Sequence, residues 1–164
     1  MRRAVCSGSF DPVTNGHIDI FARASTMFDE VIICVFHNVN KKAFFSVEER
    51  VRFLRKATRH LKNVRVDSFS GLITDYMKEH DAHIIVRGVR SIKDLEYEQN
   101  EAYMIRHLEP DIDTVFLLTR PEYSFVSSSG IRELICFHGD IHGLVPLCVE
   151  QAVKISGKDG KERE

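Results

Sequence analysis

The sequence predicts an α/β fold, in which a Rossmann-like open parallel sheet of about five strands carries helices on both faces. Short apolar runs alternate along the chain with longer segments that repeat apolar residues at helical spacing. The apolar runs are nearly continuous and rich in β-branched residues, as in strands that are covered on both faces. This alternation favours parallel strands joined by right-handed helical crossovers.

The first half of the chain holds two strand–helix pairs, with strands at residues 4–6 and 31–36. The helix at residues 16–27 has Thr14 as its expected N-cap, which places His17 in the first helical turn. The helix at residues 47–60 follows the capping-box sequence Ser46-Val47-Glu48-Glu49, which fixes its start.

The second half repeats this order with shorter apolar runs. We expect strands at residues 64–66, 84–86 and 115–118. We expect helices at residues 72–79, 92–107 and 131–137, and a last helix near 145–155. We expect one domain over residues 1–156 and a disordered tail at 157–164, because that tail contains only Gly, Lys, Asp, Glu and Arg.

The composition indicates a soluble globular protein, with 43% hydrophobic and 29% charged residues and a net charge of −1. Because this charge gives no global field, we expect neither nucleic acid nor a membrane as a partner. The sequence lacks an opening secretion signal and any apolar run of the ~20 residues that span a membrane. Cys6 and Cys34 lie in apolar runs and are expected to be free and buried, which favours the cytoplasm.

The turn at residues 8–17 is the strongest candidate for a functional element, because it joins a strand to a helix. Such a helix start presents free N–H groups and a partial positive charge, and therefore suits an anion. His17 would lie beside a bound phosphate; alternatively, it only packs or caps the helix. Asp11 and Pro12 are expected to have a structural role in this turn.

Further candidates follow the other expected strands, at residues 37–42, 87–90 and 119–129. Loops at the carboxyl ends of parallel strands share one edge of the sheet, so we expect one site. Arg87 and Arg90 need an anion or a carboxylate if they are buried; a structural salt bridge is the alternative. Three consecutive serines before residue 131 predict a second anion cradle, although simple capping needs only one of them.

The segment Thr14-Asn15-Gly16-His17 resembles the (T/H)xGH signature of the nucleotidyltransferase superfamily. Four further motifs follow it: Lys41-Lys42, Arg87-Gly88-Val89-Arg90, Tyr97-Glu98 and the stretch from Tyr123 to Ser129. Through these motifs the chain also resembles the bacterial phosphopantetheine adenylyltransferases from about residue 3 to residue 153.

The resemblance implies an enzyme that transfers the adenylyl group of ATP to 4′-phosphopantetheine by direct in-line attack. The products would be dephospho-coenzyme A and pyrophosphate, in the penultimate step of coenzyme A synthesis. It also implies Mg²⁺ held mainly by the ATP phosphates and water with few protein ligands, none of which is assigned, a homohexamer, and feedback inhibition by coenzyme A.

The resemblance also implies residue roles. His17, Lys41 and Arg90 would be catalytic, and the acceptor substrate would contact Ser9, Lys41, Ile73 and Arg87, with Lys42 remaining a surface charge. The residues implied to bind ATP are Ser9, Phe10, His17, Gly88, Val89, Arg90, Glu98, Tyr123, Ser124, Phe125, Val126, Ser127, Ser128 and Ser129.

Three alternatives remain at this point. Nicotinate-mononucleotide adenylyltransferases and cytidylyltransferases share the GxGH turn, but Lys41 and the segment at 87–90 look specific to the pantetheine enzyme. The basic stretch from residue 41 to 59 would suit RNA, although its apolar spacing favours an amphipathic surface helix. His138 and His142 are separated by a Gly-Asp turn and have no third ligand nearby, which disfavours zinc.

Overall fold

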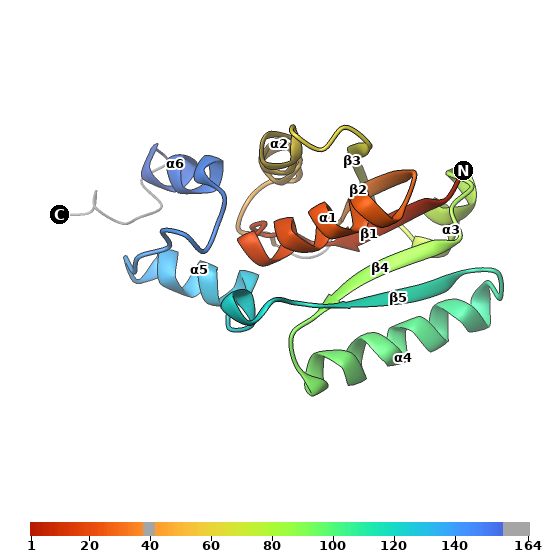
Figure 1. Ribbon diagram of the computed structural model, residues 1–164. Coiled ribbons are helices and arrows are strands. Elements are labelled where there is room, and N and C mark those ends of the chain that lie inside the picture. Colours follow the sequence, from red (N-terminus) through yellow and green to blue (C-terminus); the bar gives the residue numbers. More distant parts are fainter. Residues whose placement is uncertain (38–41, 156–164) are drawn as a thin grey trace.

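The computed structural model describes residues 1–37 and 42–155. Its centre is a five-stranded sheet in the order β3-β2-β1-β4-β5, and every neighbouring pair is parallel (Figure 1). The predicted fold class is therefore confirmed. The strands are β1 (Arg3–Gly8), β2 (Glu30–Phe36), β3 (Val64–Phe69), β4 (Ile84–Val89) and β5 (Asp113–Leu118).

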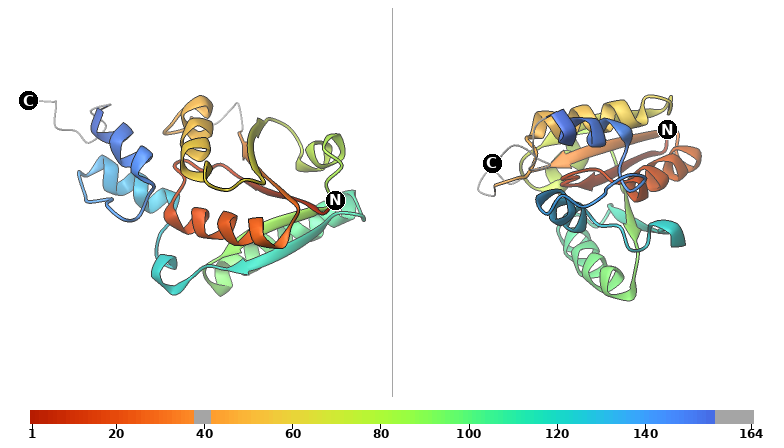
Figure 2. Two further views of the ribbon diagram at one scale, coloured as in Figure 1. Left: turned by 45° about the horizontal axis from the view of Figure 1, so that its top comes forward. Right: turned by 90° about the vertical axis from the view of Figure 1, so that its left-hand side faces the viewer.

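Helices cover both faces of the sheet, as predicted. Apolar side chains of α1 (Asn15–Met27), α2 (Val47–Thr58), α5 (Ser128–Cys136) and α6 (Leu147–Ile155) pack in one hydrophobic cluster on the first face. A second cluster joins α3 (Ile73–Glu79) and α4 (Ile92–Leu108) to the opposite face. Figure 2 shows α4 across the sheet from α1 and α2.

The strand order positions the functional site. The chain runs outward from β1 to β2 and β3, then returns to place β4 on the other side of β1. In an open parallel sheet such a reversal leaves a crevice at the carboxyl ends of the two central strands, and ligands collect there. The turn after β1 and the end of β4 meet at this crevice.

Two predicted boundaries are wrong in ways that affect the site. The fourth strand does not end at Val86, because Arg87, Gly88 and Val89 continue the ladder opposite Phe116, Leu117 and Leu118. Backbone pairing with β5 extends the strand beyond its apolar run. The helix expected at 131–137 begins at Ser128. Ser127 caps it, so Ser128 and Ser129 form its first turn.

The two predicted helix caps are confirmed. The Thr14 hydroxyl accepts the His17 amide hydrogen at 3.3 Å, and the His17 ring accepts the Thr14 amide hydrogen at 3.0 Å. Ser46 and Glu49 exchange the equivalent bonds at the start of α2. Each cap pairs backbone groups that the first helical turn leaves without partners.

None of the helices in the described ranges is both long and apolar enough to cross a membrane.

Gly88 allows α1 to pack closely against β4. A Cβ atom placed there would lie 2.9 Å from Cγ1 of Ile20, which is closer than real side chains approach. We expect Gly88→Ala to lower the free energy of unfolding by about 1–3 kcal/mol through overpacking. Urea denaturation measures this change. In an Ile20→Ala background the cost should shrink; an equal cost in both backgrounds would contradict the packing explanation.

Candidate active site

A cavity of about 790 Å³ opens at the carboxyl ends of β1 and β4. Its walls come from the turn after β1, the end of β4, one side of α4, and the segment that joins β5 to α5. The structure thus brings together three of the four loops that the sequence predicted to share one site, whereas residues 38–41 of the fourth loop lie outside the described residues. Of the candidate residues, the cavity is lined by Ser9, Phe10, His17, Arg87, Gly88, Arg90, Glu98, Tyr123, Val126, Ser127, Ser128 and Ser129.

His17 lies in this cavity with one ring nitrogen already occupied. Its Nδ1 accepts the Thr14 backbone N–H at 3.0 Å, so in the neutral ring the proton is on Nε2. The ring also packs edge-on against Phe10 at a centroid distance of 5.2 Å, which restricts its orientation. The cap therefore fixes both the tautomer and the direction of a neutral N–H donor.

Burial and the nearby Arg90 charge lower the pKa of His17 from 6.5 to about 4. The imidazole is thus neutral at physiological pH and serves as a hydrogen-bond donor rather than a cation. An unfolded chain retains the ordinary pKa and binds more protons between pH 6.5 and 4. His17 therefore stabilises the fold at neutral pH, and this contribution falls as the pH drops toward 4.

This lowered pKa gives a direct prediction for the protein without substrates. In an NMR titration, the ring signals of His17 should stay constant from about pH 8 to about pH 5, because the ring does not yet protonate. Loss of those signals in His17→Asn identifies them. A titration midpoint near the ordinary histidine value would show that the ring is solvated and charged.

Side chains hold the carbonyl groups of the turn after β1. Arg50 donates to the Ser9 carbonyl at 2.9 Å, Arg132 donates to the Asp11 carbonyl at 2.6 Å, and Ser128 donates to the Pro12 carbonyl at 2.8 Å. The buried Asp11 carboxylate accepts the Phe44 and Phe45 amide hydrogens, each at 2.8 Å. Asp11 is therefore structural, as predicted, and it ties the turn to the segment before α2.

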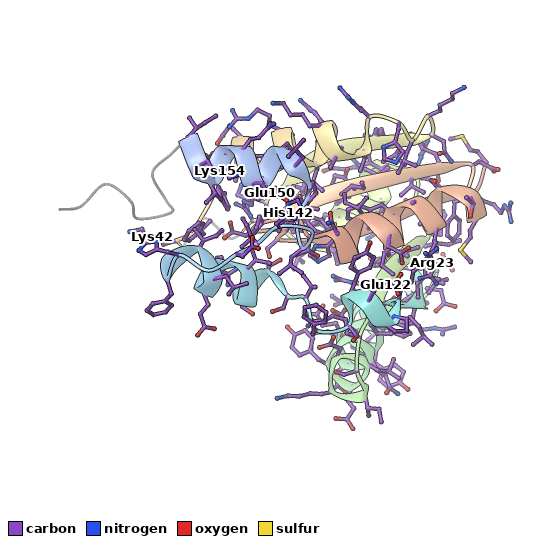
Figure 3. The ribbon with its side chains drawn as sticks, turned by 60° about the vertical axis from the view of Figure 1, so that its left-hand side comes forward. Arg23, Lys42, Glu122, His142, Glu150 and Lys154 are labelled. Carbon is purple, nitrogen blue, oxygen red and sulfur yellow. The ribbon has the colours of Figure 1, made fainter. Side chains whose placement is uncertain are left out.

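The basic stretch forms the amphipathic helix α2, as predicted, but Arg50 is buried rather than on its exposed face. Arg50 is only 3% exposed and points inward to the turn, while the other cations of α2, Arg52, Arg55 and Lys56, are exposed. The carbonyl of Ser9 is its hydrogen-bond partner, which accounts for a buried guanidinium in an otherwise amphipathic helix. Lys42, at the edge of the described residues, is exposed as predicted (Figure 3).

Arg90 connects two walls of the cavity. It donates to the Val126 carbonyl at 2.8 Å and to the Asp94 carboxylate at 2.9 Å. One guanidinium thereby joins the end of β4, the first turn of α4 and the segment before α5. Because its side chain is 33% exposed and lies beside His17, it can also face an anion in the cavity.

Arg87 is paired with carboxylates of α4. Its guanidinium lies 3.3 Å from Glu98 and 3.3 Å from Glu101, and it also donates to the Ser7 carbonyl at 2.8 Å. Burial raises the pKa of Glu98, against the opposing effect of Arg87. The salt bridge that the sequence left as an alternative is thus present.

The three serines have different partners. Ser127 accepts the Gly130 amide hydrogen at 3.0 Å and caps α5, whereas Ser128 bonds to the turn after β1. The Ser129 hydroxyl lies 3.2 Å from that of Ser127 and, like it, faces the cavity. The Ser127 oxygen thus caps the helix and Ser128 is bonded to the Pro12 carbonyl, while the hydroxyls of Ser127 and Ser129 face the cavity, where each can still donate a hydrogen bond to an anion.

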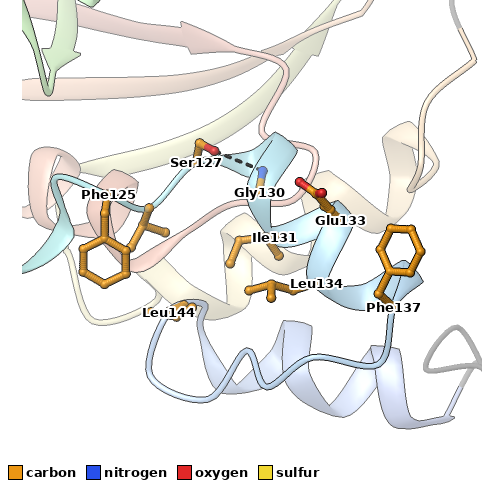
Figure 4. A pocket seen from close by; sticks show the side chains of 9 residues that line it. Phe125, Ser127, Gly130, Ile131, Glu133, Leu134, Phe137 and Leu144 are labelled. Carbon is orange, nitrogen blue, oxygen red and sulfur yellow. Dashed lines mark hydrogen bonds between the residues drawn. The ribbon is translucent and has the colours of Figure 1, made fainter.

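Four candidate residues do not line the cavity. Ile73 packs against the hydrophobic cluster under α3, and Val89 is buried in β4. Ser124 bonds to the Pro121 carbonyl, while Phe125 is 72% exposed and borders a separate apolar depression beside α5 (Figure 4). Lys41 and the tail at 157–164 lie outside the described residues.

Sequence reasoning did not assign roles to several residues that line the cavity. Arg132 lies three positions after Ser129 on α5, and residues three apart share one side of a helix. This spacing could have predicted that Arg132 faces the same cavity as the serines. Lys93, Asp94 and Glu101 are spread along an acidic helix whose pattern looks like a solvated face, so only the packed structure identifies them. The cavity therefore contains four cations, Arg87, Arg90, Lys93 and Arg132, beside three carboxylates, Asp94, Glu98 and Glu101.

The histidines at 138 and 142 belong to a different part of the surface. His142 lies 3.3 Å from the buried Glu150 of α6, which accounts for its position without a metal (Figure 3). Within residues 1–37 and 42–155, no cluster of three or more His, Cys, Asp or Glu side chains is arranged to hold a metal ion.

Comparison with known proteins identifies the family. A model of the cytidylyltransferase-like family matches residues 5–134. A phosphopantetheine adenylyltransferase of Shouchella clausii is 53% identical over 154 residues, which cover 94% of this chain and 97% of that protein. A protein of the same name from Syntrophomonas wolfei is 49% identical over 94% of this chain and 96% of its own length. A third, from Clostridium novyi, is 51% identical over 89% of this chain and 91% of its own length.

The matched residues include the turn after β1, Arg87 in β4, Arg90 directly after it, and the serines at the start of α5. The chain belongs to the cytidylyltransferase-like family and, within it, to the phosphopantetheine adenylyltransferases.

Proposed function

We propose that this protein transfers the adenylyl group of ATP to 4′-phosphopantetheine, giving dephospho-coenzyme A and pyrophosphate. The observation that carries the proposal is the meeting of His17, Arg90 and the serines of α5 in one cavity at the strand-order reversal. The relatives that bear the name of this activity match the chain over nearly its whole length.

The proposed reaction is a single displacement. A phosphate oxygen of the acceptor attacks the α-phosphorus of ATP and forms the new P–O bond. The bond from the α-phosphorus to the bridging oxygen breaks, and pyrophosphate leaves with that electron pair. The nucleophile is already an anion, so positioning and charge stabilisation provide the catalysis rather than a general base.

His17 has the central role in this mechanism. Its Nε2–H would donate to a non-bridging oxygen of the α-phosphate, where negative charge grows in the transition state. The Thr14 cap holds the ring in that tautomer, so no reorganisation is required when the charge develops. Arg90 and the hydroxyls of Ser127 and Ser129 would bind the β- and γ-phosphates, at a helix start that favours anions.

The remaining site assignments belong to the same proposal. Ser9 and Arg87 would bind the acceptor phosphate, with Lys41 as an additional cation and Ile73 beside the pantetheine arm. The nucleotide would be bordered by Phe10, Gly88, Val89, Glu98 and the stretch from Tyr123 to Val126. The cavity is not lined by Ile73, Val89, Ser124 or Phe125, so their part in this proposal is supported by the family resemblance alone.

The site also fits Mg²⁺ bound through the nucleotide. Its carboxylates face arginines, so ATP phosphate oxygens and water would supply most ligands, with Ser127 and Ser129 hydroxyls close by. The ion would screen the charge of the phosphates and of the departing pyrophosphate. We further propose a homohexamer, feedback inhibition by coenzyme A, and a cytoplasmic location with no membrane or nucleic-acid partner.

A pyrophosphate-release assay tests the function against its closest alternatives. The enzyme is supplied with ATP and 4′-phosphopantetheine, with ATP and nicotinate mononucleotide, or with CTP and an alcohol phosphate. We expect release with the first pair only. If pyrophosphate is released with one of the other two pairs and not with the first, the proposed acceptor is wrong and the enzyme acts on the substrates of that pair. Tight binding of RNA with a steep salt dependence and no release would favour a binding module instead.

A further inference from the structure

Arg87 is the centre of an ion-pair cluster on the acceptor side of the cavity. Its side chain is 18% exposed and donates hydrogen bonds to the Ser7 carbonyl and to Glu101, and its Nε lies 3.3 Å from a Glu98 oxygen as an ion pair. Glu101 is held in place from its other side, because the Tyr97 hydroxyl donates to it at 3.0 Å. This hydrogen bond raises the pKa of Tyr97. The fold thus supplies Arg87 with internal anions.

The two carboxylates differ in their surroundings. Glu98 has a side chain that is 20% exposed, and its oxygen nearest Arg87 forms an ion pair without hydrogen-bond geometry. Glu101 has a side chain that is 41% exposed and can turn toward water when another anion approaches Arg87. Of the two, Glu101 is therefore the partner that an incoming phosphate can displace at lower cost.

We infer that Glu101 is an affinity-determining residue that occupies Arg87 in place of the acceptor's phosphate and must be displaced when the acceptor binds. The inference rests on the proposed function for the identity of the acceptor and for the assignment of Arg87 to its phosphate. A phosphate dianion that enters the cavity meets the charge of Glu101 as well as that of Arg87. Glu101 thus weakens phosphate binding and selects for ligands that carry enough charge to replace it.

Glu101→Gln tests this inference, because it removes the charge and keeps the shape of the side chain. We expect the KM for 4′-phosphopantetheine and the concentration of inorganic phosphate that half-inhibits the enzyme to fall about two- to fivefold, the range for a partly exposed ion pair. The KM for ATP should change by less than these values. Tyr97→Phe releases Glu101 from one partner and should shift the same constants in the same direction by a smaller factor.

Glu96→Gln is the matched control, since Glu96 is an exposed carboxylate of the same helix and does not line the cavity. It should leave both constants near the wild-type values. If Glu101→Gln raises the KM for the acceptor, or changes it no more than the control does, Glu101 only supports Arg87 and the inference is wrong. Pantetheine without its phosphate should inhibit wild type and Glu101→Gln equally; a difference would show that the effect does not pass through the phosphate.

The failure of this inference is separate from failure of the proposed function. Absence of pyrophosphate release by the wild-type enzyme with 4′-phosphopantetheine would contradict the function. Isothermal titration with inorganic phosphate then still reports on Glu101, because that measurement needs no turnover. Tighter phosphate binding by Glu101→Gln would support the inference there, and unchanged binding would overturn it.

Discussion

His17→Ala is expected to lower kcat by about 10²–10³-fold, the usual loss when one pre-oriented donor to a developing negative charge is removed. Binding of ATP should persist, because the imidazole is neutral and its donor bond strengthens only as the α-phosphate gains charge. Single-turnover kinetics and isothermal titration with ATP separate the two effects.

His17→Asn is the informative companion variant. Asparagine can keep a side-chain acceptor for the Thr14 amide hydrogen and thus preserve the helix cap, but its amide group does not extend to the position of Nε2. We expect it to fold with near-normal stability and remain as inactive as His17→Ala. Near-normal turnover in either variant would remove His17 from the mechanism, whereas loss of activity that follows loss of stability would assign it to the cap alone.

The fold was predictable because its signals are local. The alternation of apolar runs with helical periodicity requires no knowledge of tertiary contacts, and the caps at Thr14 and Ser46 depend on residues within one turn. The end of β4 was not predictable in this way. Arg87 and Gly88 are poor strand formers taken alone, and only their pairing with Phe116 and Leu117 keeps them in the sheet.

The candidate site was predictable to the extent that strand ends determine its position. His17, Arg90 and the serines follow apolar runs, and parallel strands bring such positions to one edge. Arg50 and Glu101 lacked that signal. Each lies on a helix with many charged residues, where one inward side chain cannot be separated from its solvated neighbours until the packing partner is known.

Arg90 is the second residue whose loss should abolish most of the activity. It bridges Val126 and Asp94 and contributes to the lowered pKa of His17. Arg90→Ala should therefore reduce kcat/KM for ATP by about 10²–10³-fold, since it removes both a phosphate ligand and the tie that positions the segment before α5. Arg90→Lys keeps the charge but cannot make the two-sided fork, so its activity should lie between wild type and Arg90→Ala.

Arg106→Ala serves as the control, because Arg106 is an exposed arginine of α4 whose partner Asp113 lies 3.6 Å away at the surface. It should leave kcat/KM unchanged.

The His17 NMR signals give a second readout that activity alone does not provide. Without the positive charge of Arg90, the pKa of His17 should rise from about 4 toward its ordinary value, although burial still opposes protonation. If activity falls in Arg90→Ala while the His17 titration stays unchanged, the two side chains act independently on the phosphates. A rise in the pKa together with the loss of activity would show that Arg90 adds to the effect of burial on the His17 pKa as well as binding ATP.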